Sequence, residues 1–366
     1  MDRPNATDYR MDPHEFSRQL ADRAARTPSK LGQAPSRTLQ LAAAKPGETP
    51  YEIVHEEPPV RLRRYEPERP ATDATPVVIA YAFINDPSIL DFAPKRSVVR
   101  TLLDRGLPVY VVDWGDPSPL DRSLGLDDYV RRFLANCVDA VRERHGADAV
   151  HLLGYSTSVP LAVAYAALFP DRVRTLALQG PPIDFHAGDD MELFRSLAAE
   201  QDHERIVATF DAVPTPLLEL GLACRKPVEY TVTTPLRLWD QLDDAAFVEE
   251  QGRKLEWITG GPHVPGRLYR EFVEGLLLEN RLIENELELG GRRVDLASIE
   301  APTLLVLGTE DAYVPRAASV PLLEAIESDD TDVLELPTGH VGLSVSAVAH
   351  ERGWPQVADW FVERNA

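Results

Sequence analysis

The chain has 366 residues and a formal net charge of −21, and 44% of its residues are hydrophobic and 27% charged. This balance indicates a large buried core rather than disorder. A chain so acidic is repelled by phosphate backbones, so nucleic acid is excluded as an expected partner.

The sequence contains no stretch typical of a membrane anchor or a secretory signal. Its apolar runs are shorter than the roughly 18–20 residues that span a bilayer, and its first residues lack the apolar segment of a signal peptide. Cys137 and Cys224 are the only cysteines, and they lack the spacing of metal ligands. We therefore expect a cytoplasmic protein with no membrane span.

Lysine is scarce among the basic residues. Only five of the 38 Lys and Arg residues are lysines. An acidic, lysine-poor surface is typical of proteins that stay soluble at high salt, where screening weakens self-repulsion. A halophilic protein is therefore expected, and an acidic protein from a GC-rich genome is the alternative.

The N-terminal segment is polar and has little regular pattern. Residues 1–50 are rich in Arg, Ala, Pro and Ser, with one weak amphipathic pattern at 16–25. We expect these residues to form a loosely attached leader. Two short segments, 51–55 and 60–65, then predict an antiparallel pair of strands.

Strands and helices alternate from residue 76 to about 182, and again from 296 to the C-terminus. Continuous apolar runs are typical of strands covered on both faces, and Gly106 and Gly146 are natural helix ends. The predicted strands are 77–83, 108–113, 149–153, 173–178, 303–308 and 332–336. The predicted helices are 97–105, 127–145, 157–169, 320–326 and 356–364.

This alternation predicts an α/β fold with a mostly parallel, doubly wound sheet. The core would consist of residues 51–182 and 296–366. Residues 183–295 contain amphipathic helical stretches, several prolines and no clear strand. We expect them to form a mainly helical cap over the carboxyl ends of the strands, where ligands bind in open α/β sheets.

The segment 154–158, with the sequence GYSTS, stands where a predicted buried strand turns into a helix. This is the setting of a nucleophile elbow, whose turn lifts the middle side chain above the sheet. Ser156 is then a candidate nucleophile, and an ordinary turn serine is the alternative. The N–H group of Thr157 would stabilise an oxyanion, together with that of Phe83 or Ile84 after the first long strand.

A serine nucleophile needs a base, and the base needs an orienting acid, in the chain order Ser, acid, His. Asp311 and His340 each follow a predicted strand, so both would reach the sheet edge that carries Ser156. A turn or a helix cap is the alternative for Asp311, and Glu310 is a competing acid. An exposed loop histidine is the alternative for His340.

Other polar residues fit catalysis less well. His186 precedes the acid and is expected in a cap hinge, and the Asp-Trp-Gly sequence at 113–115 is expected in a pocket wall or the core. Cys137 is expected to be a buried thiol. The sequence has no phosphate-binding loop, zinc ligand set or calcium loop, so no cofactor and no metal is expected.

Several longer motifs run through the chain outside the candidate triad. They are NDPSILD at 85–91, LPVYVVDWG at 107–115, LDDY at 126–129, YAALFP at 165–170, VPG at 264–266 and LGGRRVDL at 289–296. In these motifs the sequence, from about residue 47 to the C-terminus, resembles the catalytic subunit of class III polyhydroxyalkanoate synthases.

The resemblance implies a capped α/β-hydrolase fold and an acyltransferase that takes (R)-3-hydroxyacyl groups from coenzyme A and joins them into a polyester. It implies that the nucleophile, acid and base are Ser156, Asp311 and His340. It also implies a separate accessory subunit, an association with polyester granules, and no cofactor beyond the CoA thioester substrate.

The chain departs from the family pattern in two respects, at the nucleophile motif and after the acid. The family has a Cys nucleophile followed two residues later by Gly-Gly, whereas this chain has Ser156 and then Ser158-Val159, and Ala312 replaces the His after the acid. A serine forms an oxyester, which is less activated than a thioester. Three hypotheses therefore stay open: polyester synthesis, hydrolysis of 3-hydroxyacyl esters or thioesters, and a weakly active paralogue that binds granules or a partner. Acyl chain length, cap opening and oligomeric state, including a homo-oligomer, also stay open.

Overall fold

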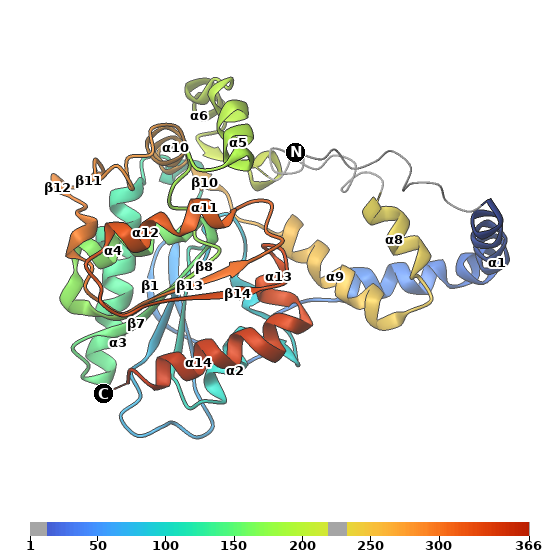
Figure 1. The fold of residues 1–366 in the computed structure, drawn as a ribbon, viewed down its shortest axis with the longest axis horizontal. Coiled ribbons are helices and arrows are strands. Elements are labelled where there is room, and N and C mark those ends of the chain that lie inside the picture. Colours follow the sequence, from blue (N-terminus) through green and yellow to red (C-terminus); the bar gives the residue numbers. More distant parts are fainter. Residues whose placement is uncertain (1–12, 219–232, 366) are drawn as a thin grey trace, which may run out of the picture. The chain divides into compact units, whose positions relative to one another are not determined.

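The computed structural model describes residues 13–218 and 233–365, and Figure 1 shows the chain as a ribbon. The chain divides into two compact units. The first contains residues 1–45 and 223–256, and the second contains residues 46–222 and 257–366. None of the helices described in either unit is long and apolar enough to cross a membrane.

The second unit is built around an eight-stranded sheet with the order β1-β2-β6-β3-β7-β8-β13-β14. Strands β6 to β14 of this order run parallel, whereas β1, β2 and β6 pair antiparallel. The mostly parallel sheet predicted from the sequence is therefore confirmed. Its strands are β1 (Glu52–Glu57), β2 (Val60–Tyr65), β3 (Val77–Ala80), β6 (Val109–Asp113), β7 (Val150–Tyr155), β8 (Val173–Gln179), β13 (Thr303–Gly308) and β14 (Thr331–Leu336).

Helices cover both faces of this sheet, as Figure 1 shows, with α3 and α4 on one side and α2 and α14 on the other. Successive strand residues point to opposite faces. Val78 and Ala80 of β3 belong to one buried cluster, and Val77 and Ile79 belong to the other. This is the doubly wound arrangement that the apolar strands predicted. The helices are α2 (Val98–Leu103), α3 (Ala135–His145), α4 (Val159–Leu168) and α14 (Trp354–Val362).

The segment between β8 and β13 is mainly helical where the structure describes it. It also contains two short antiparallel pairs, β9 with β10 and β11 with β12. The sequence did not predict these pairs, because a two-residue strand has no measurable alternation. The role of this segment as a cap stays a prediction. Its elements in the second unit are α5 (Asp189–Ala199), α6 (His203–Phe210), β9 (Ala212–Val213), β10 (Val264–Pro265), α10 (Gly266–Arg270), the π-helical η7 (Glu271–Leu278), β11 (Glu288–Leu289) and β12 (Arg292–Arg293).

Shorter elements connect the strands of the second unit. They are the 3-10 helices η1 (Pro87–Leu90), η2 (Pro119–Asp121), η4 (Ser156–Ser158), η5 (Pro170–Arg172) and η8 (Leu296–Ser298), the π-helices η3 (Asp128–Leu134) and η9 (Ala349–Gly353), the strands β4 (Asp91–Ala93) and β5 (Arg96–Ser97), and the helices α11 (Arg316–Ser319), α12 (Pro321–Ala325) and α13 (Gly342–Val345).

The described part of the first unit is helical. It contains α1 (Pro13–Ala43), α8 (Thr234–Asp240) and most of α9 (Ala245–Thr259). The Lys30 ammonium donates to the carbonyls of Trp239 and Asp240 at 2.9 and 2.7 Å, at the C-terminal end of α8, where a cation is favoured. Much of the segment that the sequence suggested as a leader is thus one helix. Its loose attachment stays a prediction.

His151 lies on the central strand β7 and is fully buried. Its two ring nitrogens lie 2.8 Å from the Thr175 hydroxyl and 3.1 Å from the side-chain oxygen of Asn365. Burial lowers the pKa of His151 to about 4 from the value of 6.5 in an unfolded chain. The unfolded chain therefore binds the proton first as the pH falls, which favours unfolding.

We predict that this residue contributes a loss of about 3 kcal/mol in the free energy of unfolding as the pH falls from neutral to about 4. His151 has its full stabilising effect above pH 6.5, the pKa in the unfolded chain. This effect is lost as the pH falls toward about 4, the pKa in the folded chain. A His151→Gln variant cannot take up the proton and should lack this loss. Urea unfolding at several pH values and constant salt measures both slopes, and equal slopes would contradict the prediction.

Candidate active site

Ser156 lies on a strained turn directly after β7. Its φ of +49° is left-handed, which residues other than glycine rarely adopt, and η4 and α4 follow at once. A Cβ at Gly154 would come within 2.9 Å of the Ala162 Cβ on α4 and 3.0 Å of Leu178 on β8. Strand and helix therefore approach too closely for a larger residue. This is the backbone shape that lifts a nucleophile above a sheet.

Ser156, His340 and Asp311 form one continuous hydrogen-bonded chain. Ser156 Oγ lies 2.8 Å from His340 Nε2, and His340 Nδ1 lies 2.6 Å from Asp311 Oδ2. The three residues follow β7, β14 and β13, whose carboxyl ends meet at one edge of the parallel sheet. When Nδ1–H donates to the carboxylate, Nε2 is the nitrogen that accepts the serine proton.

Asp311 is held in one orientation and shielded from water. Its side chain is 1% exposed. Its Oδ1 accepts hydrogen bonds from the Tyr313 and Val314 N–H groups at 2.8 and 2.9 Å, which leaves Oδ2 to face His340. Glu310, the competing acid, is exposed. Of the two acids, the structure therefore brings Asp311 to the histidine.

The His340 ring occupies space that a glycine leaves open. In the sheet, β8 lies between β7 and β13, and Gly180 comes directly after β8 with a φ of +55°. A Cβ at Gly180 would lie 2.6 Å from His340 Cε1, closer than real side chains approach. Tyr313 packs edge-on against the imidazole, with ring centroids 5.9 Å apart. These neighbours fix the ring between Ser156 and Asp311.

A second hydrogen-bonded chain is buried beside the triad. Gln179 Nε2 donates to Ser344 Oγ at 2.8 Å, and Ser344 Oγ donates to Tyr155 Oη at 2.9 Å. All three side chains are buried, and burial raises the pKa of Tyr155 to about 12, so the phenol stays neutral. The chain joins the residue before Ser156 to α13, just after His340. Sequence reasoning missed these residues because single Gln, Ser and Tyr residues carry no spacing signal.

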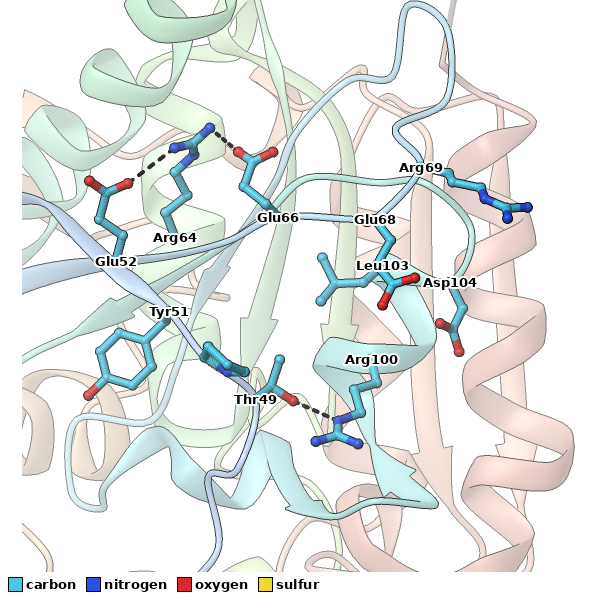
Figure 2. A pocket seen from close by; sticks show the side chains of 11 residues that line it. Thr49, Tyr51, Glu52, Arg64, Glu66, Glu68, Arg69, Arg100, Leu103 and Asp104 are labelled. Carbon is cyan, nitrogen blue, oxygen red and sulfur yellow. Dashed lines mark hydrogen bonds and ion pairs between the residues drawn. The ribbon is translucent and has the colours of Figure 1, made fainter.

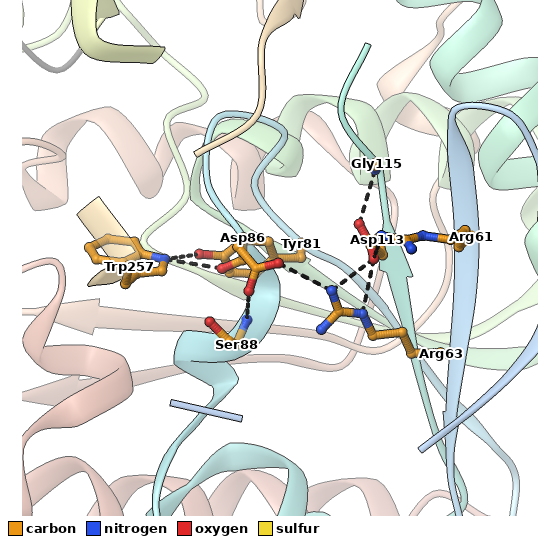
Figure 3. Close-up of polar contacts among 8 residues, drawn as sticks. All are labelled: Arg61, Arg63, Tyr81, Asp86, Ser88, Asp113, Gly115 and Trp257. Carbon is orange, nitrogen blue, oxygen red and sulfur yellow. Dashed lines mark hydrogen bonds and ion pairs between the residues drawn. The ribbon is translucent and has the colours of Figure 1, made fainter. Parts of the chain in front are cut away.

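An ion cluster anchors the loop after β3 to the carboxyl end of β6, as Figure 3 shows. Arg63 donates to Asp113 Oδ2 at 2.8 and 3.0 Å and to Asp86 Oδ2 at 3.1 Å. Arg61 donates to the same Asp113 oxygen at 2.9 Å, and the Gly115 N–H donates to Oδ1 at 3.0 Å. Although burial opposes the charge, Asp113 and Asp86 raise the pKa of Arg63. Asp113 is thus an anchor between strands.

The candidate oxyanion donors lie on the two segments that the sequence indicated. Thr157 is in η4, directly after Ser156, and Phe83 and Ile84 are in the loop that follows β3. Their role as donors stays a prediction. The hydroxyl oxygens of Thr157 and Ser158 are buried and have no hydrogen-bond partner among the described residues.

His186 and Cys137, which the sequence also singled out, are not partners in these triad hydrogen bonds. His186 is exposed, and its Nε2 lies 3.0 Å from the Leu278 carbonyl. Cys137 is a buried thiol, as expected, and burial raises its pKa. Cys224 lies outside the described residues. Within the described ranges, no group of His, Cys, Asp and Glu side chains could hold a metal ion.

A hollow of about 880 Å³, lined mostly by polar residues, lies near the amino end of β6 (Figure 2). Arg64 on its wall is paired with Tyr110, near the amino end of β6, whereas Ser156 follows the carboxyl end of β7. Arg64 already pairs with Glu52 and Glu66, and Arg100 Nε donates to the Thr49 hydroxyl at 2.7 Å. The hollow is therefore separate from the candidate active site.

Comparisons with known proteins agree with this architecture. The family model for the alpha/beta hydrolase fold matches residues 75–217. Over 353 residues the chain is 40% identical to the poly(3-hydroxyalkanoate) polymerase subunit PhaC of Haloferax mediterranei, covering 96% of this chain and 71% of that protein. It is 42% identical over 327 residues to the PhaC of Haloarcula marismortui, covering 87% and 69%. The chain belongs to the poly(3-hydroxyalkanoate) polymerase subunit family.

A further relative matches this chain over nearly the whole length of both proteins. The PhaC of Allochromatium vinosum is 35% identical over 337 residues, covering 92% of this chain and 94% of that protein. The family and the fold make the chain an enzyme of the acyltransferase type on an α/β-hydrolase scaffold, as the sequence motifs predicted. The haloarchaeal origin of two relatives agrees with the acidic, lysine-poor composition.

We predict that Gly180→Ala slows the labelling of Ser156 by a fluorophosphonate by about tenfold or more, because the new methyl group displaces the His340 ring. Gly146→Ala is the matched control, since Gly146 has a similar φ of +61° and nothing within 4 Å of its added Cβ. Both variants should lose about 1–2 kcal/mol of stability from the left-handed backbone. Equal labelling rates in the two variants would contradict the role given to His340.

Proposed function

We propose that this polymerase-family enzyme transfers (R)-3-hydroxyacyl groups from coenzyme A thioesters to the hydroxyl end of a polyester chain, with Ser156 as the nucleophile. The observation that carries the proposal is the hydrogen-bonded chain from Ser156 Oγ through His340 to Asp311, with distances of 2.8 and 2.6 Å. It lies in a chain whose relatives are named poly(3-hydroxyalkanoate) polymerase subunits.

In the acylation step, Ser156 Oγ attacks the thioester carbonyl while His340 Nε2 takes the hydroxyl proton. The carbonyl oxygen becomes an oxyanion, for which the N–H of Thr157 and that of Phe83 or Ile84 are the candidate donors. The tetrahedral adduct then collapses, the carbon–sulfur bond breaks, and the coenzyme A sulfur receives the proton from His340. The products are free coenzyme A and an acyl ester on Ser156.

In the transfer step, the terminal hydroxyl of a polyester chain attacks the acyl ester. His340 now takes the proton of that hydroxyl and returns it to Ser156 Oγ as the ester bond to the enzyme breaks. The polyester is one unit longer, and Ser156 is regenerated. These steps move protons and one acyl group only, so the proposed reaction requires no metal or redox cofactor.

Asp311 contributes by fixing the histidine. A carboxylate that accepts Nδ1–H keeps the imidazole in the tautomer whose Nε2 faces Ser156, and it stabilises the imidazolium formed in each step. The two backbone N–H groups on its other oxygen prevent the carboxylate from rotating away. Asp311 therefore acts on Ser156 indirectly, by orienting the rigid imidazole ring of His340.

Hydrolysis is the second candidate function, and the serine itself favours it. An acyl oxyester on Ser156 is less activated toward a hydroxyl than a thioester, so water competes for longer. Which acceptor wins depends on how well residues 183–295 exclude water as a cap. The third hypothesis, a weakly active paralogue, is not favoured by a triad with all of its hydrogen bonds in place.

The partners follow from the same proposal. The relatives are named as subunits, so we propose that a separate accessory subunit assists the enzyme. We also propose a cytoplasmic location at the surface of polyester granules, where the growing chain would be held. A homo-oligomer is compatible with this arrangement.

The first test uses 3-hydroxybutyryl-CoA in high salt, with and without an accessory subunit. We expect free coenzyme A together with insoluble polyester, and a Ser156→Ala variant should release coenzyme A at the uncatalysed rate because no acyl ester can form. Free coenzyme A with only soluble 3-hydroxybutyrate would replace synthesis by hydrolysis. Unchanged release by Ser156→Ala would refute the assignment of the nucleophile.

A Ser156→Cys variant tests the effect of the nucleophile on the acceptor. Its acyl thioester stays activated toward a hydroxyl, so the ratio of polyester to soluble acid should rise relative to the wild type. The ratio is measured after complete turnover of a fixed amount of 3-hydroxybutyryl-CoA. A ratio that stays the same would mean that the acyl linkage does not decide between synthesis and hydrolysis.

A further inference from the structure

The loop between β3 and η1 is held at both of its ends by one indole. Trp257 Nε1 donates to Tyr81 Oη at 2.9 Å and to the Asp86 carbonyl at 3.1 Å (Figure 3). Phe83 and Ile84, the candidate oxyanion donors, lie between these two acceptors. Trp257 is 8% exposed, so this shared hydrogen bond is largely protected from water.

Other contacts hold the same loop in place. The Trp114 indole donates to the Tyr81 carbonyl at 2.5 Å, and Arg63 donates to the Asp86 carboxylate at 3.1 Å. Between these ends, the Phe83 ring packs edge-on against Phe272 with centroids 5.3 Å apart. Every one of these partners comes from a part of the chain outside the loop. These tertiary contacts therefore help to set the position of the loop.

The loop also contacts the strand residue that precedes the nucleophile turn. The Tyr81 ring packs on the Tyr155 ring, with centroids 4.7 Å apart, and Tyr155 immediately precedes Ser156. The hydroxyl of Ser344 in turn donates to Tyr155 Oη. The two segments that would carry oxyanion donors thus meet through the rings of Tyr81 and Tyr155. Trp257 donates to the hydroxyl of Tyr81.

We propose that Trp257 is a positioning residue for the oxyanion donors. Its N–H fixes Tyr81 and Asp86 relative to each other, which sets where the N–H groups of Phe83 and Ile84 point. Oxyanion donors act only within about 3 Å of the developing charge, and displacements of about 0.5 Å already weaken such sites. This role rests on the proposed acyl transfer at Ser156, and it adds a residue that does not touch the substrate.

A substitution that removes the N–H and keeps an aromatic ring tests this role. In Trp257→Phe, kcat for coenzyme A release from 3-hydroxybutyryl-CoA should fall about tenfold, with KM changed by less than about twofold. The reason is that a displaced donor weakens binding of the transition state more than binding of the ground state. The pH profile of kcat should keep its shape, since the hydrogen bonds of His340 are untouched.

Trp360→Phe is the matched control. Trp360 is 7% exposed, and its Nε1 donates to Asp332 Oδ2 at 3.0 Å, on β14. Both variants lose one buried indole donor and should therefore lose a comparable amount of stability. Rates are divided by the fraction of Ser156 that a fluorophosphonate labels at completion, so unfolded protein does not count. On this scale Trp360→Phe should match the wild type.

Equal normalised kcat values in the two variants would overturn the positioning role, as would a loss explained by fewer labelled sites. If Trp257→Phe does not fold, Tyr81→Phe removes one acceptor and keeps the ring on Tyr155. It should lower normalised kcat about threefold, and a kcat within error of the wild type would overturn the proposal. Ser156→Ala separates the two levels: if it leaves coenzyme A release unchanged, acyl transfer at Ser156 itself fails.

Discussion

The carboxylate of Asp311 is the fixed point on which the candidate site depends. Its buried charge must be satisfied by hydrogen bonds, because an unpaired carboxylate in the core is costly. Two backbone N–H groups donate to one oxygen, which leaves the other oxygen to accept a hydrogen bond from a side chain. His340 takes that position, which determines the nitrogen that it presents to Ser156. A change in the loop after β13 would therefore alter all three side chains together.

Backbone geometry around the triad is as demanding as its side chains. The left-handed turn at Ser156 needs the close approach that Gly154 permits, and the imidazole needs the space beside Gly180. Both glycines lie at or next to the ends of neighbouring strands, where parallel pairing sets their spacing. The geometry of the candidate active site thus depends on the carboxyl ends of these strands, which carry the three residues.

The sequence predicted those features that local patterns encode. Continuous apolar runs located β3, β7 and β13, and chain order with strand ends singled out Ser156, Asp311 and His340. The hydrogen bonds of Trp257 and Ser344 could not be predicted, because their partners Tyr81 and Tyr155 lie far away in the sequence and share no spacing. The long helix α1 was recognised only in part, since it contains two prolines in its interior and its contacts with α8 depend on tertiary structure.

The ion cluster of Arg63 has a consequence at the high salt concentrations that the acidic, lysine-poor composition led us to expect. At molar ionic strength the Debye length is only about 3 Å, so pairs on the surface contribute little. The side chains of Arg63 and Asp113 are only 9% and 6% exposed, where mobile ions cannot enter. The attraction that tethers the loop after β3 should therefore persist in concentrated salt, while the charges of the acidic exterior are screened.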